Sequence, residues 1–340
     1  MTTISVIIPT NRDAAVVAPC LAGLAAQDFD LRTMEVIVVH NGGGSPPRWH
    51  DAAWPFRFAA LHIDRASAGA ARNAGLDHAT GELVLFLNDD VIPGPKLVAE
   101  HVRAHRVIER PGLVLGRCDW PRYADETVFD RMIHTTSMLF FYDRMEPHRW
   151  YGFRHAWTLN LSVARSHADA VRFDERFRVY YEDLEWAWRL RERFGLAVWY
   201  EPAAGGVHHH RHTLEGYLAH ERRMGRTARL LWEVNPACFR EIFGANLDED
   251  YIAYCRTYVD IEGRREEDML ASLRTVVARR PAELAADTNT LADLVTTFYF
   301  AHLPLKRLAF RRGLIEASHD ALPPAPTTHA STTAHAPHPV

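Results

Sequence analysis

Three side chains that carry oxygen atoms follow an apolar run in the stretch GELVLFLNDDVIPG, residues 81–94. Acidic side chains such as those of Asp89 and Asp90 are rarely buried unless they are paired or bind a metal. Together with the amide of Asn88, their carboxylates suit a hard cation, Mg²⁺ or Mn²⁺. The cluster therefore indicates a cation site that would neutralise a substrate diphosphate. A solvated turn at a strand end, which favours the same residue types, is the alternative.

A second acidic pair, Glu182 and Asp183, lies in the stretch YYEDLEW, residues 180–186. Acids at the start of a helix stabilise the helix dipole and cap its free N–H groups. The alternative is that Asp183 is a general base that reaches into the site. Four flanking aromatic residues favour this alternative, because they would suit a sugar ring: Tyr180, Tyr181, Trp186 and Trp188.

Histidines gather in the stretch GGVHHHRH, residues 205–212. Neutral imidazole is a common metal ligand, but no cysteine or acid accompanies these histidines at a zinc-finger spacing. We expect one of them to complete the metal site formed by the acids, and the others to be loop residues.

Small residues fill the stretch ASAGAARNAG, residues 66–75. They permit a close approach of the backbone, and Arg72 could pair with a phosphate or position an acid. The stretch has neither a Walker lysine nor the GxGxxG pattern. A tightly packed helix explains the small residues equally well.

The elements that would position these residues alternate between strands and helices in the N-terminal half. Apolar, β-branched runs predict strands at residues 4–9, 34–40 and 82–87, and residues 68–79 predict a short helix. This alternation indicates an α/β fold with a parallel sheet that is covered on both faces. Ligands of such sheets bind at the carboxyl ends of the strands. We therefore expect residues 9–13 and the NDD cluster to face one crevice.

The second half of the chain is predicted to be mainly helical. The patterns predict a strand, a helix and another strand at residues 111–117, 182–194 and 196–202. Residues 213–312 have mostly helical patterns. The tail, residues 319–340, is rich in Pro, Thr, Ala and His and has too few large apolar residues to fold, so we expect it to be disordered.

The composition of the 340-residue chain argues against several classes of protein. A net charge of −4 gives no electrostatic footprint for nucleic acid, so no nucleic-acid partner is expected. The four cysteines lie far apart without a CxxC pair and are expected to be reduced thiols. The first residues do not resemble a signal peptide, and no window approaches the roughly 18–20 apolar residues of a spanning helix. These features predict a soluble, cytoplasmic protein.

Taken in order, six segments resemble the motifs of family 2 glycosyltransferases of the GT-A fold. They are ISVIIPTNR, VIVVHNGG, GAARNAG, LFLNDDVIP, the pair NLSVARSHADAVRFDERF and YYEDLEWAWRLRERFG, and EPAAGGVHHH. The resemblance implies a Rossmann-like, mostly parallel sheet flanked by helices. It predicts a GT-A domain at residues 1–225, followed by a helical extension at 226–318 and the disordered tail at 319–340.

The resemblance also implies roles for single residues. Asp183 would be the general base, and Glu182 would support it or contact the acceptor. Asp90, Asn88 and His208 would hold Mg²⁺ or Mn²⁺ at the diphosphate of the donor. The nucleotide sugar would be bound by Pro9, Thr10, Asn11, Arg12, His40, Asn41, Arg72, Asn88 and Asp89.

The sequence departs from the family pattern at two positions. His40 stands where the family usually has an acid on the nucleobase side, which leaves the choice of UDP, GDP or dTDP open. Asn88 stands at the first acid of the D-x-D region, so Asp90 and His208 must carry more of the metal binding. The Q-x-x-R-W motif of processive synthases is absent, and the corresponding residues read HERRMGR. Transfer of a single sugar is therefore expected.

The implied reaction moves one sugar, with inversion, from a nucleotide diphosphate sugar to a hydroxyl of a sugar or lipid-linked acceptor. Synthesis of a cell-surface polysaccharide, glycolipid or glycoconjugate is the expected setting. A non-catalytic nucleotide-sugar-binding or scaffold protein of the same fold is one alternative. A sugar nucleotidyltransferase is another, although the chain lacks the glycine-rich triphosphate loop of such enzymes.

The helical extension would form the acceptor side of the site or an oligomer surface. Its basic amphipathic stretch, residues 298–314, allows two interpretations. It would either rest peripherally on an anionic membrane, at the inner face, or pack in the core with a solvated basic face.

Overall fold

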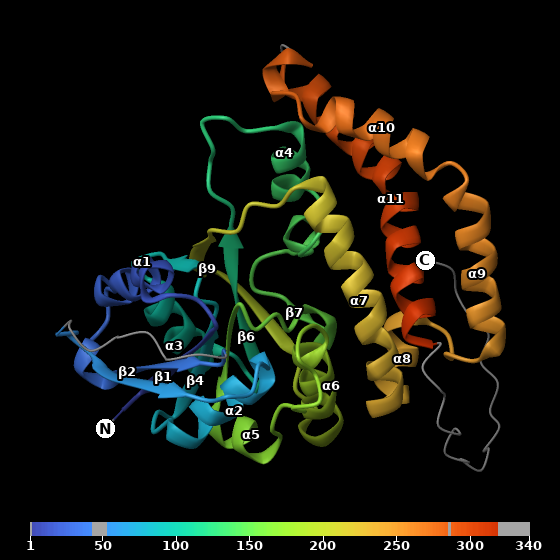
Figure 1. The fold of residues 1–340 in the computed structure, drawn as a ribbon. Coiled ribbons are helices and arrows are strands. Elements are labelled where there is room, and N and C mark those ends of the chain that lie inside the picture. Colours follow the sequence, from blue (N-terminus) through green and yellow to red (C-terminus); the bar gives the residue numbers. More distant parts are fainter. Residues whose placement is uncertain (1, 43–52, 285–286, 319–340) are drawn as a thin grey trace.

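The computed structural model describes residues 2–42, 53–284 and 287–318 (Figure 1). The predicted disordered tail and most of the loop after residue 41 lie outside these residues. In the described part, nine strands form one sheet. In spatial order they are β3 (Arg57–His62), β2 (Met34–His40), β1 (Ile4–Thr10), β4 (Leu83–Leu87), β8 (Asn160–Ala164), β6 (Leu113–Asp119), β9 (Val198–His208) and β5 (Val91–Pro93), while β7 (Trp150–Tyr151) pairs with β9 off this path.

The half of the sheet that carries the N-terminus is parallel. Strands β3, β2, β1 and β4 run in one direction, and the register places Thr10 beside His40 at the carboxyl ends of β1 and β2. All residues of β2 are buried, as expected for a strand that helices cover on both faces. The helices beside the sheet are α1 (Ala14–Ala25), α2 (Ala68–His78), α3 (Leu97–Val107) and α5 (Arg165–Ala170) (Figure 1). Of these, α2 packs on β1 and β2, α3 on β6 and β9, and α5 on β4 and β8. The predicted strands and the helix at 68–79 are confirmed.

The other half of the sheet is mixed. Strand β8 lies antiparallel between β4 and β6, and β9 runs parallel to β6. The short strand β5 begins directly after Asp90 and pairs antiparallel with the end of β9, so that Val91 lies opposite His208. The strands predicted at 111–117 and 196–202 are confirmed as β6 and β9, and β9 continues to His208. This pairing brings the histidine stretch beside the NDD cluster.

Helix α6 (Glu182–Phe194) is fixed to the sheet by one indole ring. Trp186 is fully buried, stacks on Phe173 with ring centroids 4.5 Å apart, and meets Phe86 of β4 edge-on at 5.6 Å. Its Nε1 donates a hydrogen bond to the carbonyl of Val171 (2.7 Å). The helix ends as predicted at Gly195, whose φ of 68° suits a glycine C-cap. The expectation that Trp186 forms part of a sugar-binding wall is wrong, because its ring fills the core.

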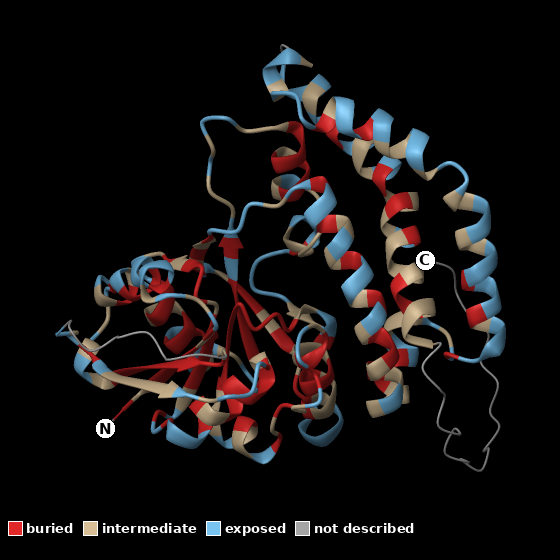
Figure 2. Cartoon of the chain, viewed as in Figure 1, coloured by how far each residue is buried: buried red, intermediate tan, exposed pale blue. Residues whose placement is uncertain are grey.

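The C-terminal region packs beside the α/β part of the molecule as a layer of helices. It consists of α7 (Leu214–Val234), α8 (Pro236–Phe243), α9 (Glu249–Gly263), α10 (Glu266–Val277) and α11 (Thr288–Ser318). Together with α4 (Val128–Thr135), three of these helices enclose a second, smaller core. Figure 2 shows that the faces of α9 and α10 turned away from the molecule are mostly exposed. No helix in the described ranges has an apolar stretch long enough to span a bilayer.

The basic amphipathic stretch at 298–314 lies within α11. Its apolar residues Leu305, Leu308 and Leu314 are buried. Lys306 forms an ion pair with Glu221 of α7 at 3.4 Å. The stretch therefore packs its apolar face inside the helical region, which agrees with the second of the two interpretations.

Helices α7 and α11 cross where each presents a glycine to the other. A Cβ atom on Gly225 would lie 1.9 Å from the carbonyl oxygen of Phe310, and one on Gly313 would lie 1.9 Å from that of Arg222. Only residues without a side chain allow this approach. The crossing brings the cationic part of α11 toward the sheet.

We predict that Gly225→Ala destabilises the protein by about 1–3 kcal/mol, because the added methyl group forces two backbones apart. Urea unfolding followed by circular dichroism would measure this. Gly263→Ala is the matched control, since its Cβ would meet only the tip of the Arg312 side chain at 3.4 Å. The helix propensity of alanine should make this control neutral or slightly stabilising. Equal unfolding midpoints for Gly225→Ala and the unchanged protein would contradict the close crossing.

Candidate active site

The carboxyl ends of β1, β2 and β4 meet in one crevice, as the sequence predicts. Thr10 Oγ1 donates a hydrogen bond to Asp89 Oδ2 (2.6 Å), and the backbone N–H of Asn41 donates to the carbonyl of Thr10 (2.8 Å). Burial raises the pKa of Asp89, and the charge of Asp90 adds to this effect. Pro9 is placed one residue earlier, inside β1 and opposite Val39. Thr10, and not Pro9, is therefore the residue of β1 that lies at the end of the strand.

Asp90 is the centre of a buried charge cluster. His208 Nε2 lies 3.2 Å from its Oδ1, His210 Nδ1 lies 3.5 Å from its Oδ2, and a guanidinium nitrogen of Arg12 lies 3.0 Å from the same Oδ2. Burial alone would raise the pKa of Asp90, but these partners outweigh it and hold the pKa well below its usual value. The carboxylate is thus ionised at every physiological pH.

This cluster fits a divalent cation. One ligand atom each from Asp90, His208 and His210 lies within 4.8 Å of the other two. Asp90 Oδ1 has no hydrogen-bond partner among the described residues, although His208 Nε2 is close to it. Neighbouring ligands of an octahedral ion at about 2.1 Å lie about 3 Å apart. The separation of 3.2 Å between His208 Nε2 and Asp90 Oδ1 suits two neighbouring ligands of such an ion.

The observed candidate ligands differ from the predicted set in one member. Asp90 and His208 are brought together as predicted, and His210, which was expected to be a loop residue without this role, joins them. The predicted ligand Asn88 lines the adjoining cavity. The approach of His210 depends on the path of the chain after β9, which no sequence pattern reports.

A histidine pair stands on the predicted nucleobase side. His40 Nδ1 lies 3.0 Å from His62 Nδ1, and the two rings stack with centroids 5.2 Å apart. Burial and the neighbouring His62 lower the pKa of His40. A Cβ atom on Gly42 would lie 3.4 Å from His40 Nε2 and 3.5 Å from the Cβ of Asn11. Residues Asn11, His40 and Gly42 thus meet here, and His62 was missed because β3 was not predicted.

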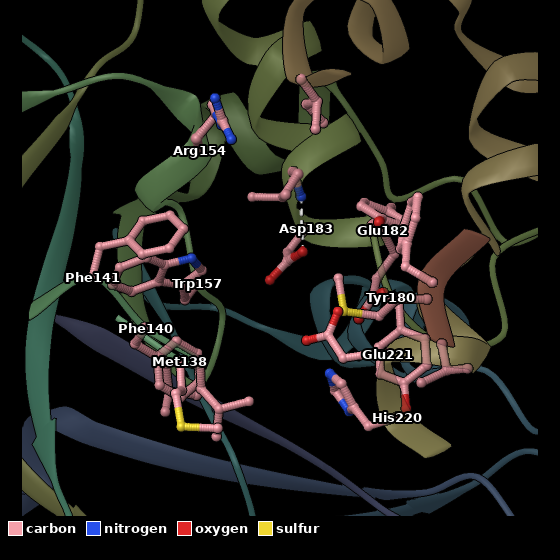
Figure 3. Close-up of a pocket in the computed structure, with 18 of the residues that line it drawn as sticks. Met138, Phe140, Phe141, Arg154, Trp157, Tyr180, Glu182, Asp183, His220 and Glu221 are labelled. Atoms are coloured by element: carbon pink, nitrogen blue, oxygen red, sulfur yellow. Dashed lines mark hydrogen bonds between the residues drawn. The ribbon is translucent and has the colours of Figure 1, made fainter. Parts of the chain in front are cut away.

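Asp183 lies in a cavity of about 600 Å³ between the sheet and the helical layer (Figure 3). Figure 3 shows its carboxyl group between Trp157 on one side and Tyr180 and Glu221 on the other. One carboxyl oxygen accepts a hydrogen bond from the backbone N–H of Leu184 (2.8 Å). Burial, followed by the charge of Glu182, raises the pKa of Asp183 to about 7. A carboxyl group with such a pKa can accept a proton near neutral pH.

Glu182 has a different partner from its neighbour. A guanidinium nitrogen of Arg72 donates a hydrogen bond to Glu182 Oε1 at 3.0 Å, and both side chains are buried. Arg72 also lies over the ring of Phe173, 5.5 Å from its centroid. Of the predicted roles for Arg72, the described contacts fit the one that positions an acid. The helix around it is also tightly packed, since a Cβ on Gly75 would lie 2.5 Å from Ile7.

The chain enters α6 through a strained turn. Tyr180 and Tyr181 have φ values of 64° and 63°, which non-glycine residues rarely adopt. Each such residue costs about 1–3 kcal/mol, and strain of this kind is typical of functional sites. Both tyrosines line the cavity, as predicted. Trp188 does not line it and instead donates a hydrogen bond to Glu241 (3.0 Å).

Several aromatic residues of the site were missed. The ring of Trp120 lies 4.9 Å from that of His208, and the ring of Phe140 lies 6.2 Å from it. Phe140 also lines the Asp183 cavity. One aromatic wall therefore joins the candidate metal cluster to the cavity. The run MLFFYD at 138–143 was the available signal, but a run of this kind does not show which rings leave the core.

The chain is similar in sequence to known proteins. The model of the family described as glycosyl transferase family 2 matches residues 5–173. The chain is 29% identical over 221 residues to a validoxylamine A glucosyltransferase of Streptomyces hygroscopicus, covering 55% of this chain and 51% of that protein. It is 29% identical over 243 residues to the pre-mycofactocin glycosyltransferase of Mycobacterium tuberculosis, covering 65% and 47%. The chain thus spans about half the length of these curated relatives.

A solved structure agrees with the fold. The mannosyltransferase PcManGT of Pyrobaculum calidifontis, in complex with GDP-Man and Mn²⁺, superposes with a TM-score of 0.52. The alignment covers 93% of this chain and 86% of the mannosyltransferase at 19% identity. At this identity the likeness shows the architecture of the chain.

We predict that Arg72→Met destabilises the protein by about 3–5 kcal/mol, because it leaves the buried carboxylate of Glu182 without its partner. Chemical unfolding would measure the loss. The double variant Arg72→Met/Glu182→Gln removes the buried charge as well and should recover most of the stability. A double variant as unstable as the single one would show that the arginine acts through packing alone.

Proposed function

Because the chain belongs to glycosyl transferase family 2 and has the GT-A fold, we propose that it transfers one sugar from a nucleotide diphosphate sugar to an acceptor hydroxyl, with inversion and with the help of a divalent cation. One observation carries this proposal. Asp183, whose pKa is raised, lines the same cavity as Asn88, the first residue of the NDD cluster. A proton acceptor thus lies beside the candidate diphosphate site.

The donor would bind across the carboxyl ends of β1, β2 and β4. Asn11, His40 and Asn41 would line its nucleoside, and Thr10 holds Asp89 in place. Arg12 would turn from Asp90 toward the diphosphate, because a bound cation would take its place as the counter-charge. The complex of the Pyrobaculum mannosyltransferase with GDP-Man agrees with a donor of this class.

Asp90, His208 and His210 would hold Mg²⁺ or Mn²⁺, with Asn88 nearby. When bound, the ion would offset the charge of the nucleoside diphosphate that leaves. The donor set of one carboxylate and two imidazoles fits such an ion, and the Pyrobaculum mannosyltransferase was solved with Mn²⁺.

Asp183 would take the proton from the acceptor hydroxyl as that oxygen attacks the anomeric carbon from the face opposite the diphosphate. The new glycosidic bond forms as the bond to the diphosphate oxygen breaks, so the configuration inverts. The Arg72–Glu182 pair would act as a positioning element, since it ties the first turn of α6 to α2. The aromatic wall would exclude water from the attack.

We also propose that two parts of the chain have different roles. Residues 1–225 would bind the donor and supply the base, while the helices at 226–318 would complete the acceptor side. Ile242, Tyr251 and Phe310 support this division, because these residues of α8, α9 and α11 line the cavity. A nucleotide-sugar-binding protein without activity would bind the same donors but leave them intact.

A panel of UDP-, GDP- and dTDP-sugars with Mn²⁺, read as thermal shift, tests the proposed function first. Slow hydrolysis of the bound donor by water then reports turnover without a known acceptor. A donor that stabilises the protein and is never hydrolysed would favour the non-catalytic alternative. No shift with any donor would contradict the proposal.

Asp183→Asn should reduce donor hydrolysis at least about 100-fold, the usual contribution of a general base, while the Kd for the donor stays unchanged. In the unchanged protein the rate should rise with pH and level off above about 7, because Asp183 is protonated below its raised pKa and can act as a base only above it. Exposed Asp77→Asn on α2 is the control. If the rate of hydrolysis fell only below pH 5, Asp183 would not be the general base.

Asp90→Asn should weaken Mn²⁺ binding by more than tenfold, measured by calorimetry on the protein alone, because it removes the only charged ligand of the cluster. His210→Gln should have a smaller effect, since the side chain of His210 is 44% exposed. Asp77→Asn again serves as control. Unchanged affinity in Asp90→Asn would rule out this cluster as the site.

A further inference from the structure

The Asp183 cavity has walls of unusual composition for a molecule that would bind a sugar alone. Phe140, Phe141 and Trp157 form one side of it (Figure 3). Phe243 and Phe310, from α8 and α11, line the side formed by the helical layer, and their rings pack together with centroids 5.5 Å apart. An acceptor held here would bury apolar surface on two sides, which favours a ligand with an apolar body.

The acidic residues of the cavity are already accounted for. Glu182 is paired with Arg72 at 3.0 Å, and Glu221 is paired with Lys306 at 3.4 Å. The remaining carboxyl group, that of Asp183, is the proposed proton acceptor. None of these groups can also neutralise a further cation in the wall.

Three further arginines line the cavity: Arg154, Arg307 and Arg311. None of them forms an ion pair with a carboxylate in the part of the chain that the structure covers, whereas most other arginines described here do. Arg154 and Arg307 are exposed at the rim. Arg311 lies 4.3 Å from the ring centroid of Tyr258, and its buried Nε has no hydrogen-bond partner among the described atoms.

A neutral acceptor would offer these guanidinium groups no counter-charge. An acidic group would instead gain charge-assisted hydrogen bonds, for which the guanidinium geometry is well suited. Arg307 and Arg311 lie one helical turn apart on α11 and Arg154 comes from the segment before β8. The three arginines therefore line the cavity from two elements.

We propose that the acceptor is an amphipathic molecule with an apolar body and a carboxylate or phosphate group, which Arg154, Arg307 and Arg311 bind while Asp183 faces the hydroxyl. This inference rests on the proposed function and names the acceptor class of that same site. Two kinds of molecule share the chemistry: soluble aryl or alkyl acids, and lipids with a phosphate headgroup.

Two matched ligand pairs test the inference on the full chain by calorimetry. p-Nitrophenyl glucuronide and p-nitrophenyl glucoside differ in one carboxylate, and octyl phosphate and octanol differ in one phosphate. We expect the acid of at least one pair to bind about tenfold more tightly than its neutral partner. Preference for the glucuronide alone would indicate a soluble acid, and preference for octyl phosphate alone would indicate a lipid phosphate.

Variants link any preference to the cavity. Arg307→Gln should reduce the preference for the acid over its neutral partner to about twofold or less. Arg256→Gln removes an exposed arginine of α9 outside the cavity and should leave this preference unchanged. Equal binding of acid and neutral ligand in both pairs, or a preference unaffected by Arg307→Gln, would overturn the inference. Donor thermal shifts measured on the same samples keep this result separate, since they test the proposed function without an acceptor.

Discussion

The burial of two carboxyl pairs, Asp89 with Asp90 at the strand ends and Glu182 with Asp183 at the start of α6, is the constraint on which the rest of the structure depends. Each of them loses hydration, and this costs free energy unless a partner offsets the loss. Asp89 accepts a hydroxyl hydrogen bond, Asp90 faces two imidazoles and a guanidinium, and Glu182 is paired with Arg72. Asp183 accepts a hydrogen bond from the backbone N–H of Leu184 and forms no ion pair among the described residues, and burial followed by the charge of Glu182 raises its pKa. The partners of Asp90 hold its pKa low, whereas the pKa values of Asp89 and Asp183 are raised. In the proposed function, Asp183 is the proton acceptor.

The partners come from distant segments, so the fold must deliver them together. The antiparallel pairing of β5 with β9 sets His208 beside Asp90, and α2 carries Arg72 beneath the first turn of α6. Trp186 holds α6 against β4, which allows the strained turn before it to persist. Helices α7 and α11 then line the Asp183 cavity, and they cross closely at Gly225 and Gly313.

The sequence predicts the parts of this structure that are encoded locally. Buried strands at 4–9, 34–40 and 82–87 and the helix ending at Gly195 have strong patterns, and the strand assignments placed Thr10, His40 and Asp89 at neighbouring strand ends. Strand β3 was missed because its residues are only partly buried, so its apolar pattern is weak. The burial of Trp186, the approach of His210 and the cavity itself depend on contacts between residues far apart in the chain. Neither spacing nor composition reports such contacts.

The departure from the family pattern at Asn88 has a physical meaning. A second acid at position 88 would add negative charge close to Asp90, where burial already opposes it. Asn88 avoids this repulsion, and the imidazoles of His208 and His210 lie beside Asp90 in its place. In the proposed site, imidazole ligands shift the preference away from Mg²⁺, which favours oxygen ligands, toward transition-metal ions. The loss of a carboxylate would therefore change which ion the crevice selects more than whether it binds one.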